Sequence, residues 1–312
     1  MDKTHFGRSA EEQTRLETSR LASLIGAHVT RDGTAETPIQ GLYFNRYSQT
    51  EPSDYLHTMQ WPTVGIAAQG TKMIKIGDAT SEYSGSRILV APVAVPIRMQ
   101  TIQASASEPF LGVGVYLDPH RIAALIPQVF PNGLPKIGKR SASYVLEGEP
   151  ALIGAVARLV ACLDESGDNG LLASLAADEI FIRLLRSPIG VYVAETVLAG
   201  SDVQRVAKAI DWLRSHFAES LKIAELADMV HLSESSFREY FKSVTSMSPL
   251  QYQKALRLQE ARRLMLSGGR DITTACQLVG YISDSQFSRD YSRFFGNPPS
   301  RDIAKWKQGL IS

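Results

Sequence analysis

The sequence is poor in cysteine, has no long apolar run and carries almost no net charge. Its 312 residues include two cysteines, Cys162 and Cys276, which are too few for a disulfide framework or a cysteine zinc site and which fit a reducing compartment. No run of about 18 apolar residues occurs, and the first residues lack the apolar core of a secretion signal, so we expect neither a membrane partner nor export. A net charge of +1 argues against a histone-like protein and an acidic disordered one. These absences predict a cytoplasmic globular protein.

The chain has the length and composition of a two-domain protein. Domains commonly hold about 100–200 residues, and a hydrophobic fraction of 44% is enough for a sizeable core. The charge is unevenly distributed, because residues 202–312 carry 16 Lys and Arg against 12 Asp and Glu, whereas the rest carries 17 against 20. A basic C-terminal part beside an acidic N-terminal part favours a polyanionic partner for the former, although many solvated helical domains carry a similar charge.

The N-terminal half predicts one helix followed by short strands. Residues 10–28 have the pattern of an amphipathic helix. Short β-rich runs separated by turn residues then follow, which is typical of a β-sandwich or barrel. Pro92 and Pro96 place the fourth run at an edge or a bend. The five runs are residues 64–68, 71–76, 87–91, 93–99 and 110–117.

Helices follow the strands. Residues 121–126, 151–164 and 171–186 have helical patterns, and the last two carry apolar stripes. Such stripes can pack on the barrel or form a dimer surface, and the two patterns look alike in sequence. Pro188 and Gly190 stop the last of these helices, and a turn at residues 199–202 marks the expected domain boundary.

The remaining residues predict an all-helical region with an internal repeat. Residues 223–249 resemble residues 272–298, with an offset of 49 in the first helix and 50 in the second. Each unit consists of a short helix, a tight turn and a longer helix, which is the helix-turn-helix pattern. The predicted helices cover residues 203–217, 223–230, 233–244, 249–266, 272–279, 283–295 and 301–307.

The second helix of each unit has features of a DNA recognition helix. Ser233 and Ser283 are good N-caps, and Glu234 and Asp284 place negative charge in the first turn. An apolar stripe can anchor each helix, and an opposite face of short polar residues and arginine can enter a major groove about 12 Å wide. The stripes are Phe237, Tyr240, Phe241 and Val244, and Phe287, Tyr291 and Phe294; the opposite faces hold Ser235, Arg238, Glu239 and Lys242, and Ser285, Ser288, Arg289 and Ser292.

A long helix is predicted between the two units. At a rise of 1.5 Å per residue, residues 249–266 span about 27 Å. A strut of that length can hold two recognition helices in successive major grooves, which lie about 34 Å apart on one face of DNA. The alternative is a helical bundle whose duplicated hairpin serves only protein contacts.

These motifs resemble the DNA-binding domain of AraC/XylS-type transcription regulators over about 100 residues. Three positions depart from the family pattern: Met247 stands where glycine is usual, Glu239 replaces a polar or basic residue, and Cys276 replaces alanine. The matching motifs are Ile223-Ala224 with Leu226-Ala227, Ser233-x3-Phe237-x3-Phe241-Lys242, Ser248-Pro249-x2-Tyr252, Arg257-x3-Ala261-x2-Leu264, Gly280-Tyr281-x-Ser283-x-Ser285-x-Phe287-Ser288-Arg289 and Phe295-Gly296-x-Pro298.

The resemblance implies roles for individual residues on double-stranded DNA. Arginine suits guanine O6 and N7, acidic residues can accept from cytosine N4, and phosphate contacts position the protein without specifying sequence. The base contacts implied are Ser235, Arg238 and Glu239 in the first recognition helix and Asp284, Ser285 and Arg289 in the second. The phosphate contacts implied are Lys242, Lys254, Arg257 and Arg293.

The N-terminal part resembles the cupin-like sensor domain of one subgroup of these regulators. The stretches that carry this resemblance are Gln69-Gly70-x-Lys72, Ile76-Gly77-Asp78, Tyr83, Pro109-Phe110-Leu111, Leu117-Asp118-Pro119 and Glu179-x3-Arg183-Leu184-Leu185-x3-Gly190. It implies a dimeric bacterial regulator whose barrel senses a small molecule, with RNA polymerase as a further candidate partner.

The expected fold is therefore an α+β two-domain protein: a cupin-like β-barrel with flanking helices, then an all-α domain of two helix-turn-helix units joined by a linker helix. The expected divisions are an N-terminal helix and arm (1–36), a sensor and dimerisation domain (37–190), a linker (191–201) and a DNA-binding domain (202–312).

An enzyme is the competing interpretation. A metal-dependent cupin needs clustered histidines, but His57 stands alone in the strand region, so the remaining alternative is a metal-free cupin enzyme with a helical appendage. Gly112-x-Gly114 does not open a helix and is not a dinucleotide loop, and we expect no cofactor. Small barrels hold apolar ligands with a few polar anchors. Candidate effector contacts, each equally compatible with core packing, are Tyr43, Trp61, Gln69, Tyr83 and Met99.

Overall fold

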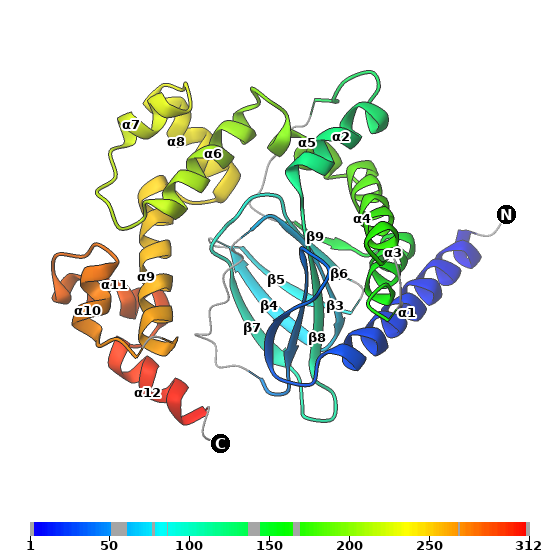
Figure 1. Ribbon diagram of the computed structural model, residues 1–312, viewed down its shortest axis with the longest axis horizontal. Helices are drawn as coiled ribbons and strands as arrows, with labels where there is room; N and C mark the ends of the chain where they lie inside the picture. The colour runs from blue at the N-terminus through cyan, green and yellow to red at the C-terminus, as the bar shows by residue number, and fades with distance from the viewer. Residues whose placement is uncertain are drawn as a thin grey trace.

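The computed structural model describes residues 3–50, 61–76, 79–85, 87–136, 144–164, 169–267 and 269–309. His57 lies outside these residues. The expected α+β architecture is confirmed: a domain of two β-sheets with helices on one side stands beside an all-helical domain (Figure 1). No helix in the described part of the chain is long and apolar enough to span a membrane.

In the part of the chain that the structure describes, nine strands form two sheets, which we call the β-domain. One sheet has the strand order β1-β2-β8-β3-β6-β9 and the other β5-β4-β7, and the paired strands are antiparallel. The strands are β1 (Gly33–Glu36), β2 (Leu42–Tyr47), β3 (Thr63–Gln69), β4 (Thr71–Ile76), β5 (Ala79–Ser84), β6 (Arg87–Ala91), β7 (Arg98–Gln103), β8 (Phe110–Tyr116) and β9 (Tyr144–Glu147).

The six-stranded sheet is buried on both faces. Val64 and Ile66 of β3 share a core with the helices, whereas Gly65 and Ala67, which alternate with them, point toward the space between the sheets. Figure 1 shows α1, α3 and α4 gathered on the outer side of this sheet. The helices of this part are α1 (Lys3–His28), α2 (Pro119–Val129), α3 (Pro150–Ala161), α4 (Asn169–Arg186) and α5 (Gly190–Val197).

One predicted strand is wrong. Residues 93–99 do not form a continuous strand, because β7 begins only at Arg98 and the chain before it is irregular apart from a single bridge at Val95. Pro92 precedes this stretch and Pro96 lies within it, and a proline has no N–H to donate to a sheet. The strands β1, β2, β5 and β9 were not predicted, and α1 begins earlier than the predicted residue 10.

The C-terminal part holds the two predicted helix-turn-helix units. The first is α7 with α8, the second is α10 with α11, and the 19-residue α9 joins them, a length of about 28 Å at 1.5 Å per residue. α5 occupies most of the segment that the sequence predicts as a linker. The helices are α6 (Asp202–Ser215), α7 (Ile223–Met229), α8 (Glu234–Thr245), α9 (Pro249–Ser267), α10 (Ile272–Leu278), α11 (Asp284–Phe295) and α12 (Pro299–Gly309).

The ends of the recognition helices match between the units. Ser233 Oγ accepts from the Ser236 amide at 3.2 Å, and Ser283 Oγ accepts from the Gln286 amide at 3.3 Å, so both predicted caps are present. At the other end, Ser246 (φ 60°) and Gly296 (φ 80°) both adopt the left-handed conformation. The residue that replaces the usual glycine is thus Ser246, and the assignment of that position to Met247 is wrong by one residue.

The two units differ in their attachment to the β-domain. The core of the first unit is continuous with the inner residues of the β-domain, and Tyr252 Oη on α9 donates to the Ala94 carbonyl at 2.8 Å. The second unit has a separate core around Phe287, Tyr291 and Phe295. This shared core therefore joins the β-domain to the first unit.

Candidate nucleic-acid interface and binding pocket

The recognition helix α8 has one buried and one exposed face. Phe237, Phe241 and Val244 are buried in the core of the first unit. The four side chains predicted to face DNA are all exposed, and the Arg238 guanidinium lies 3.2 Å from the Glu234 carboxylate. These four are Ser235, Arg238, Glu239 and Lys242.

The helix α11 repeats this arrangement with one shift. Its buried stripe is Phe287, Tyr291 and Phe295, whereas the predicted member Phe294 is half-buried, because position 295 lies closer to the face that contacts α9 and α12. The side chains predicted to touch DNA are again exposed, and Asp284 accepts a bond from Thr273 Oγ1 at 3.3 Å. They are Asp284, Ser285, Arg289 and Arg293.

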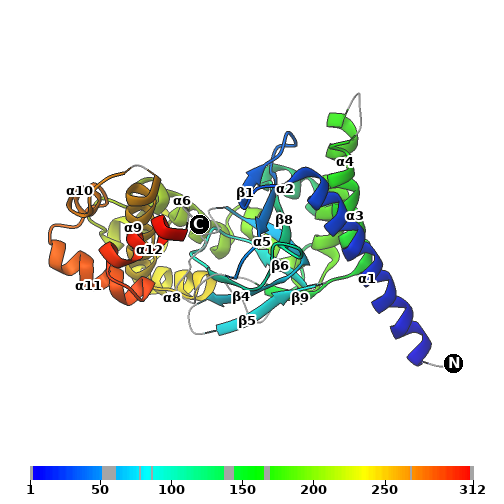
Figure 2. The same ribbon diagram turned by 90° about the horizontal axis from the view of Figure 1, so that it is seen from below.

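The two recognition helices lie along one edge of the helical domain. Figure 2 shows α8 and α11 on the same side of α9, with α6 and α10 on the other. In Figure 1 the same two helices lie toward opposite ends of α9. This placement puts both recognition helices on one side of α9, toward its opposite ends.

Two of the predicted phosphate contacts have protein partners. Lys254 Nζ lies 3.1 Å from the carboxylate of Asp290, a residue of α11 that is itself largely buried. Arg257 donates to four backbone carbonyls, those of Phe217, Ala218, Glu219 and Gly280. Half-burial lowers the pKa of Arg257 without neutralising it. Arg257 therefore joins the loop between α6 and α7 to the turn of the second unit.

Gly280 completes this junction. It adopts φ 83°, and a Cβ at this position would lie 2.0 Å from the Ala218 carbonyl oxygen. The corresponding residue of the first unit, His231, is also left-handed, with φ 57°. The extra turn residue of the second unit is Ile282, which is fully exposed.

A buried ion pair holds the last helix in place and was not predicted. The Arg262 guanidinium on α9 contacts the Asp302 carboxylate on α12 at 2.9 and 3.0 Å. Tyr291 Oη donates to the same carboxylate at 2.7 Å, and burial raises the pKa of this phenol. All three side chains are buried, so this network joins α9, α11 and α12.

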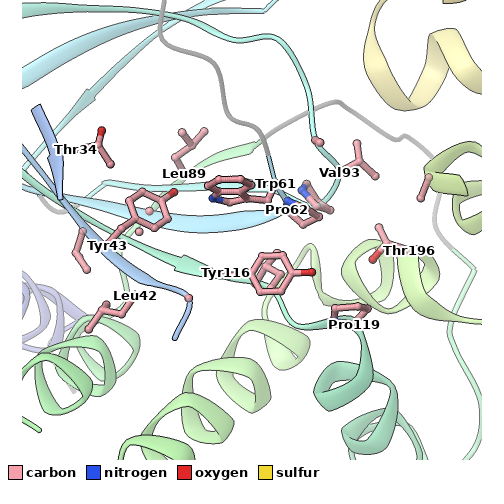
Figure 3. Close-up of a pocket in the computed structure, with 18 of the residues that line it drawn as sticks. Thr34, Leu42, Tyr43, Trp61, Pro62, Leu89, Val93, Tyr116, Pro119 and Thr196 are labelled. Atoms are coloured by element: carbon pink, nitrogen blue, oxygen red, sulfur yellow. The ribbon is translucent and has the colours of Figure 1, made fainter. Parts of the chain in front are cut away.

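A pocket of about 1160 Å³ opens between the β-domain and the helices α2, α5 and α6. Figure 3 shows Tyr43, Trp61 and Tyr116 around this space, with Thr196 of α5 on its far side. Of the predicted effector contacts, Tyr43, Trp61, Tyr83 and Met99 line the pocket. Gln69 is not among the lining residues of the described chain, because its side chain donates to the Pro109 carbonyl at 2.8 Å.

Glycines form part of the pocket wall. A Cβ on Gly114 would lie 2.1 Å from Tyr43 Cζ, and one on Gly112 would lie 3.0 Å from the Phe110 ring. Gly65 faces the Tyr83 hydroxyl in the same way, at 3.1 Å. These glycines let aromatic rings lie against the strands while leaving space between the sheets. No three His, Cys, Asp or Glu side chains of the described residues gather closely enough to hold a metal ion.

Comparison with known proteins agrees with both halves of the chain. Residues 38–192 match the family model of the AraC-type transcriptional regulator N-terminus, and residues 226–304 match a helix-turn-helix domain model. The transcriptional activator RhaS of Yersinia pestis (strain Pestoides F) is 29% identical over 147 residues, which are 46% of this chain. The match spans 52% of that protein, so the chain covers about half the length of this relative.

The fold resembles solved structures of ToxT from Vibrio cholerae. A 1.65 Å structure of ToxT aligns with a TM-score of 0.57 and 13% identity, covering 85% of this chain and 98% of ToxT. A ToxT structure with bound unsaturated fatty acid aligns with a TM-score of 0.52 and 10% identity, covering 88% and 97%. At these identities the likeness concerns the fold. The two family models, at residues 38–192 and 226–304, show that the chain belongs to the AraC-type transcriptional regulators.

Proposed function

We propose that the protein is a sequence-specific DNA-binding regulator that inserts α8 and α11 into two successive major grooves. The observation that carries this proposal is the repeated helix: each is capped by serine, anchored by an aromatic stripe and exposed on a polar, arginine-bearing face. Both helices lie on one side of α9, toward opposite ends of this strut of about 28 Å.

The base contacts in this proposal are the exposed residues of the two helices. Arg238 and Arg289 suit guanine, and the carboxylates of Glu239 and Asp284 can accept from cytosine. Ser235 and Ser285 complete the two sets. Lys242, Arg293 and the exposed part of Lys254 serve phosphates, whereas Arg257, with its four carbonyl partners, is left out of the interface.

The pocket of the β-domain is the proposed effector site. It is enclosed by the sheets and bordered by Gln204, Lys208, Asp211 and Arg214 of α6, the helix that packs against α8. A ligand there touches both the β-domain and α6, so its binding can shift the position of α8 through α6. The ToxT structure with a bound fatty acid supports an effector of small-molecule size for this fold.

We further propose a homodimer that works in the cytoplasm on chromosomal DNA and is not an enzyme. The exposed leucines Leu171, Leu172 and Leu175 on α4 form an apolar surface that a second copy of the chain can cover. RNA polymerase is a further partner, since a DNA-bound regulator lies beside it at a promoter.

Genome-wide mapping of binding sites tests the proposal, followed by gel shifts on the sites found. The expected result is a shared sequence element that the purified chain binds at least about 10³ times more tightly than unrelated DNA. Binding without sequence preference, together with turnover of a small molecule, would instead favour the metal-free cupin enzyme.

A further inference from the structure

The turn of the second helix-turn-helix unit is one residue longer than the turn of the first. Val230 and Val279 are the C-caps of α7 and α10, the first helices of the two units. Ser233 and Ser283 are the N-caps of the recognition helices α8 and α11. Along the sequence, two residues lie between these caps in the first unit and three in the second. The comparison of the two units leaves Ile282 as the residue without a counterpart.

The packing of this turn does not use the Ile282 side chain. An apolar residue directly before an N-cap often packs against the fourth residue of the helix, and in the first unit Leu232 at this place is half-buried against the core. In the second unit Tyr281 takes the packing role, because it is buried and its ring lies 5.3 Å from that of Phe287 in an edge-to-face arrangement. Ile282 follows it and is fully exposed.

The place of Ile282 is the end of α11 that reaches DNA in a helix-turn-helix. In such motifs the N-terminal residues of the recognition helix contact the base edges. Asp284 and Ser285, the exposed residues of this end, follow Ile282 after the cap. Single exposed apolar residues are common on protein surfaces, so exposure alone carries no conclusion. An inserted apolar residue that the turn does not pack, directly before the base-contacting end, points to a contact with DNA.

The chemistry of the major groove decides which group suits an isoleucine. The base edges there present hydrogen-bond donors and acceptors, and the apolar group among them is the C5-methyl group of thymine. Isoleucine has no donor or acceptor in its side chain, so it gains most by covering that methyl group. Its branched Cβ also restricts the first side-chain torsion, so little rotamer freedom is lost when the side chain is held against a base.

We propose that Ile282 is a specificity-determining residue that contacts the C5-methyl group of a thymine in the major groove entered by α11. The inference rests on the proposed function of α11 as a recognition helix, and it adds a base identity and the side chain that reads it. It also distinguishes the two units, because Leu232, the apolar residue before α8, is half-buried against the core of the first unit.

Gel shifts of the full chain on a mapped operator test the inference, with each thymine replaced in turn by deoxyuridine, which pairs in the same way and lacks only the methyl group. We expect one replacement to weaken binding of the unsubstituted chain about fourfold, which corresponds to about 0.8 kcal/mol for one buried group of this size. In Ile282→Ala the same replacement should change the affinity by less than about 1.5-fold, because the methyl group has lost its partner.

Two controls accompany these variants. Leu278→Ala removes another exposed apolar side chain of the same unit, on α10, and it should keep the full fourfold loss at that thymine. Because the Ile282 side chain is fully exposed, Ile282→Ala should leave the urea midpoint of unfolding unchanged, so a change in its DNA affinity does not come from loss of the fold.

The outcomes separate this inference from the proposed function. The methyl contact is overturned if no thymine of the operator responds to the replacement, or if Ile282→Ala responds as strongly as the unsubstituted chain. It is also overturned if Ile282→Ala weakens binding to unrelated DNA as much as to the operator, which would assign Ile282 to the sugar-phosphate backbone. The preference of the unsubstituted chain for the operator over unrelated DNA reports the proposed function separately. If that preference persists without a thymine effect, the methyl contact alone is wrong.

Discussion

Replacing Arg257 by alanine removes the side chain that joins the two halves of the DNA-binding domain. Its guanidinium donates to the carbonyls of Phe217, Ala218, Glu219 and Gly280, at 2.7 to 3.2 Å. These carbonyls belong to the loop between α6 and α7 and to the turn of the second unit, whereas Arg257 belongs to α9.

The cost follows from which carbonyls lose their donor. Gln253 Nε2 also donates to the carbonyls of Phe217 and Glu219, so these two keep a partner in the variant. The carbonyls of Ala218 and Gly280 lose the bond from Arg257. A hydrogen bond to a charged group contributes about 1.5–3 kcal/mol, and Arg257 is half-buried, so water compensates in part. We expect Arg257→Ala to lower the free energy of unfolding by about 2–4 kcal/mol.

Urea unfolding followed by far-ultraviolet circular dichroism measures this loss, and hydrogen exchange locates it. Exchange should accelerate in residues 217–219 and at Gly280. Arg263→Ala is the matched control on the same helix, since Arg263 is exposed and pairs with Glu260 at the surface, and it should cost less than about 0.5 kcal/mol. If Arg257→Ala unfolds like the unsubstituted chain and keeps its specific DNA affinity, the junction does not hold the two units in place.

Four further substitutions test other parts of the structure. In a gel-shift series, Arg289→Ala should lower the binding free energy by about 1–3 kcal/mol through one base position, whereas Lys242→Ala should weaken binding to all sequences alike. Uniform weakening by Arg289→Ala would assign that residue to a phosphate contact. Ser246→Gly should raise the free energy of unfolding by about 0.5–1 kcal/mol, because glycine adopts φ 60° without strain, and a lower thermal midpoint would contradict the left-handed cap. Gly114→Ala should lower the free energy of unfolding by about 1–3 kcal/mol, because the added Cβ would overlap the Tyr43 ring. An unchanged free energy of unfolding would show that the Tyr43 ring can move aside.

The helix-turn-helix units were predictable because their signals are local. An N-cap serine and an aromatic stripe at spacings of three and four residues lie within one helix, so Ser233 and Phe237 indicate α8 without knowledge of the rest of the fold. The same reasoning failed by one position at Ser246, where the backbone conformation, which sequence spacing does not reveal, decides which residue ends the helix.

Contacts between distant segments were not predictable in this way. The Arg257 partners lie 23 to 40 residues away, so its family motif indicated a phosphate contact while the fold supplies carbonyls. The pairing of Lys72 with Tyr83 depends on the register of β4 against β5, and β5 was not predicted. The spacing of Gly112 and Gly114 is visible in the sequence. Their role, which is to leave room for the rings of Phe110 and Tyr43, depends on contacts that only the fold shows.

Methylation interference on a mapped operator is the decisive test of how α8 and α11 bind DNA, because guanine N7 lies in the major groove. We expect one protomer to give two patches of interfering positions on the same face of the duplex, about 10 base pairs apart. Arg289→Ala should remove interference in one patch and leave the other. A single patch per protomer, or two patches on opposite faces, would contradict the insertion of α8 and α11 into successive grooves.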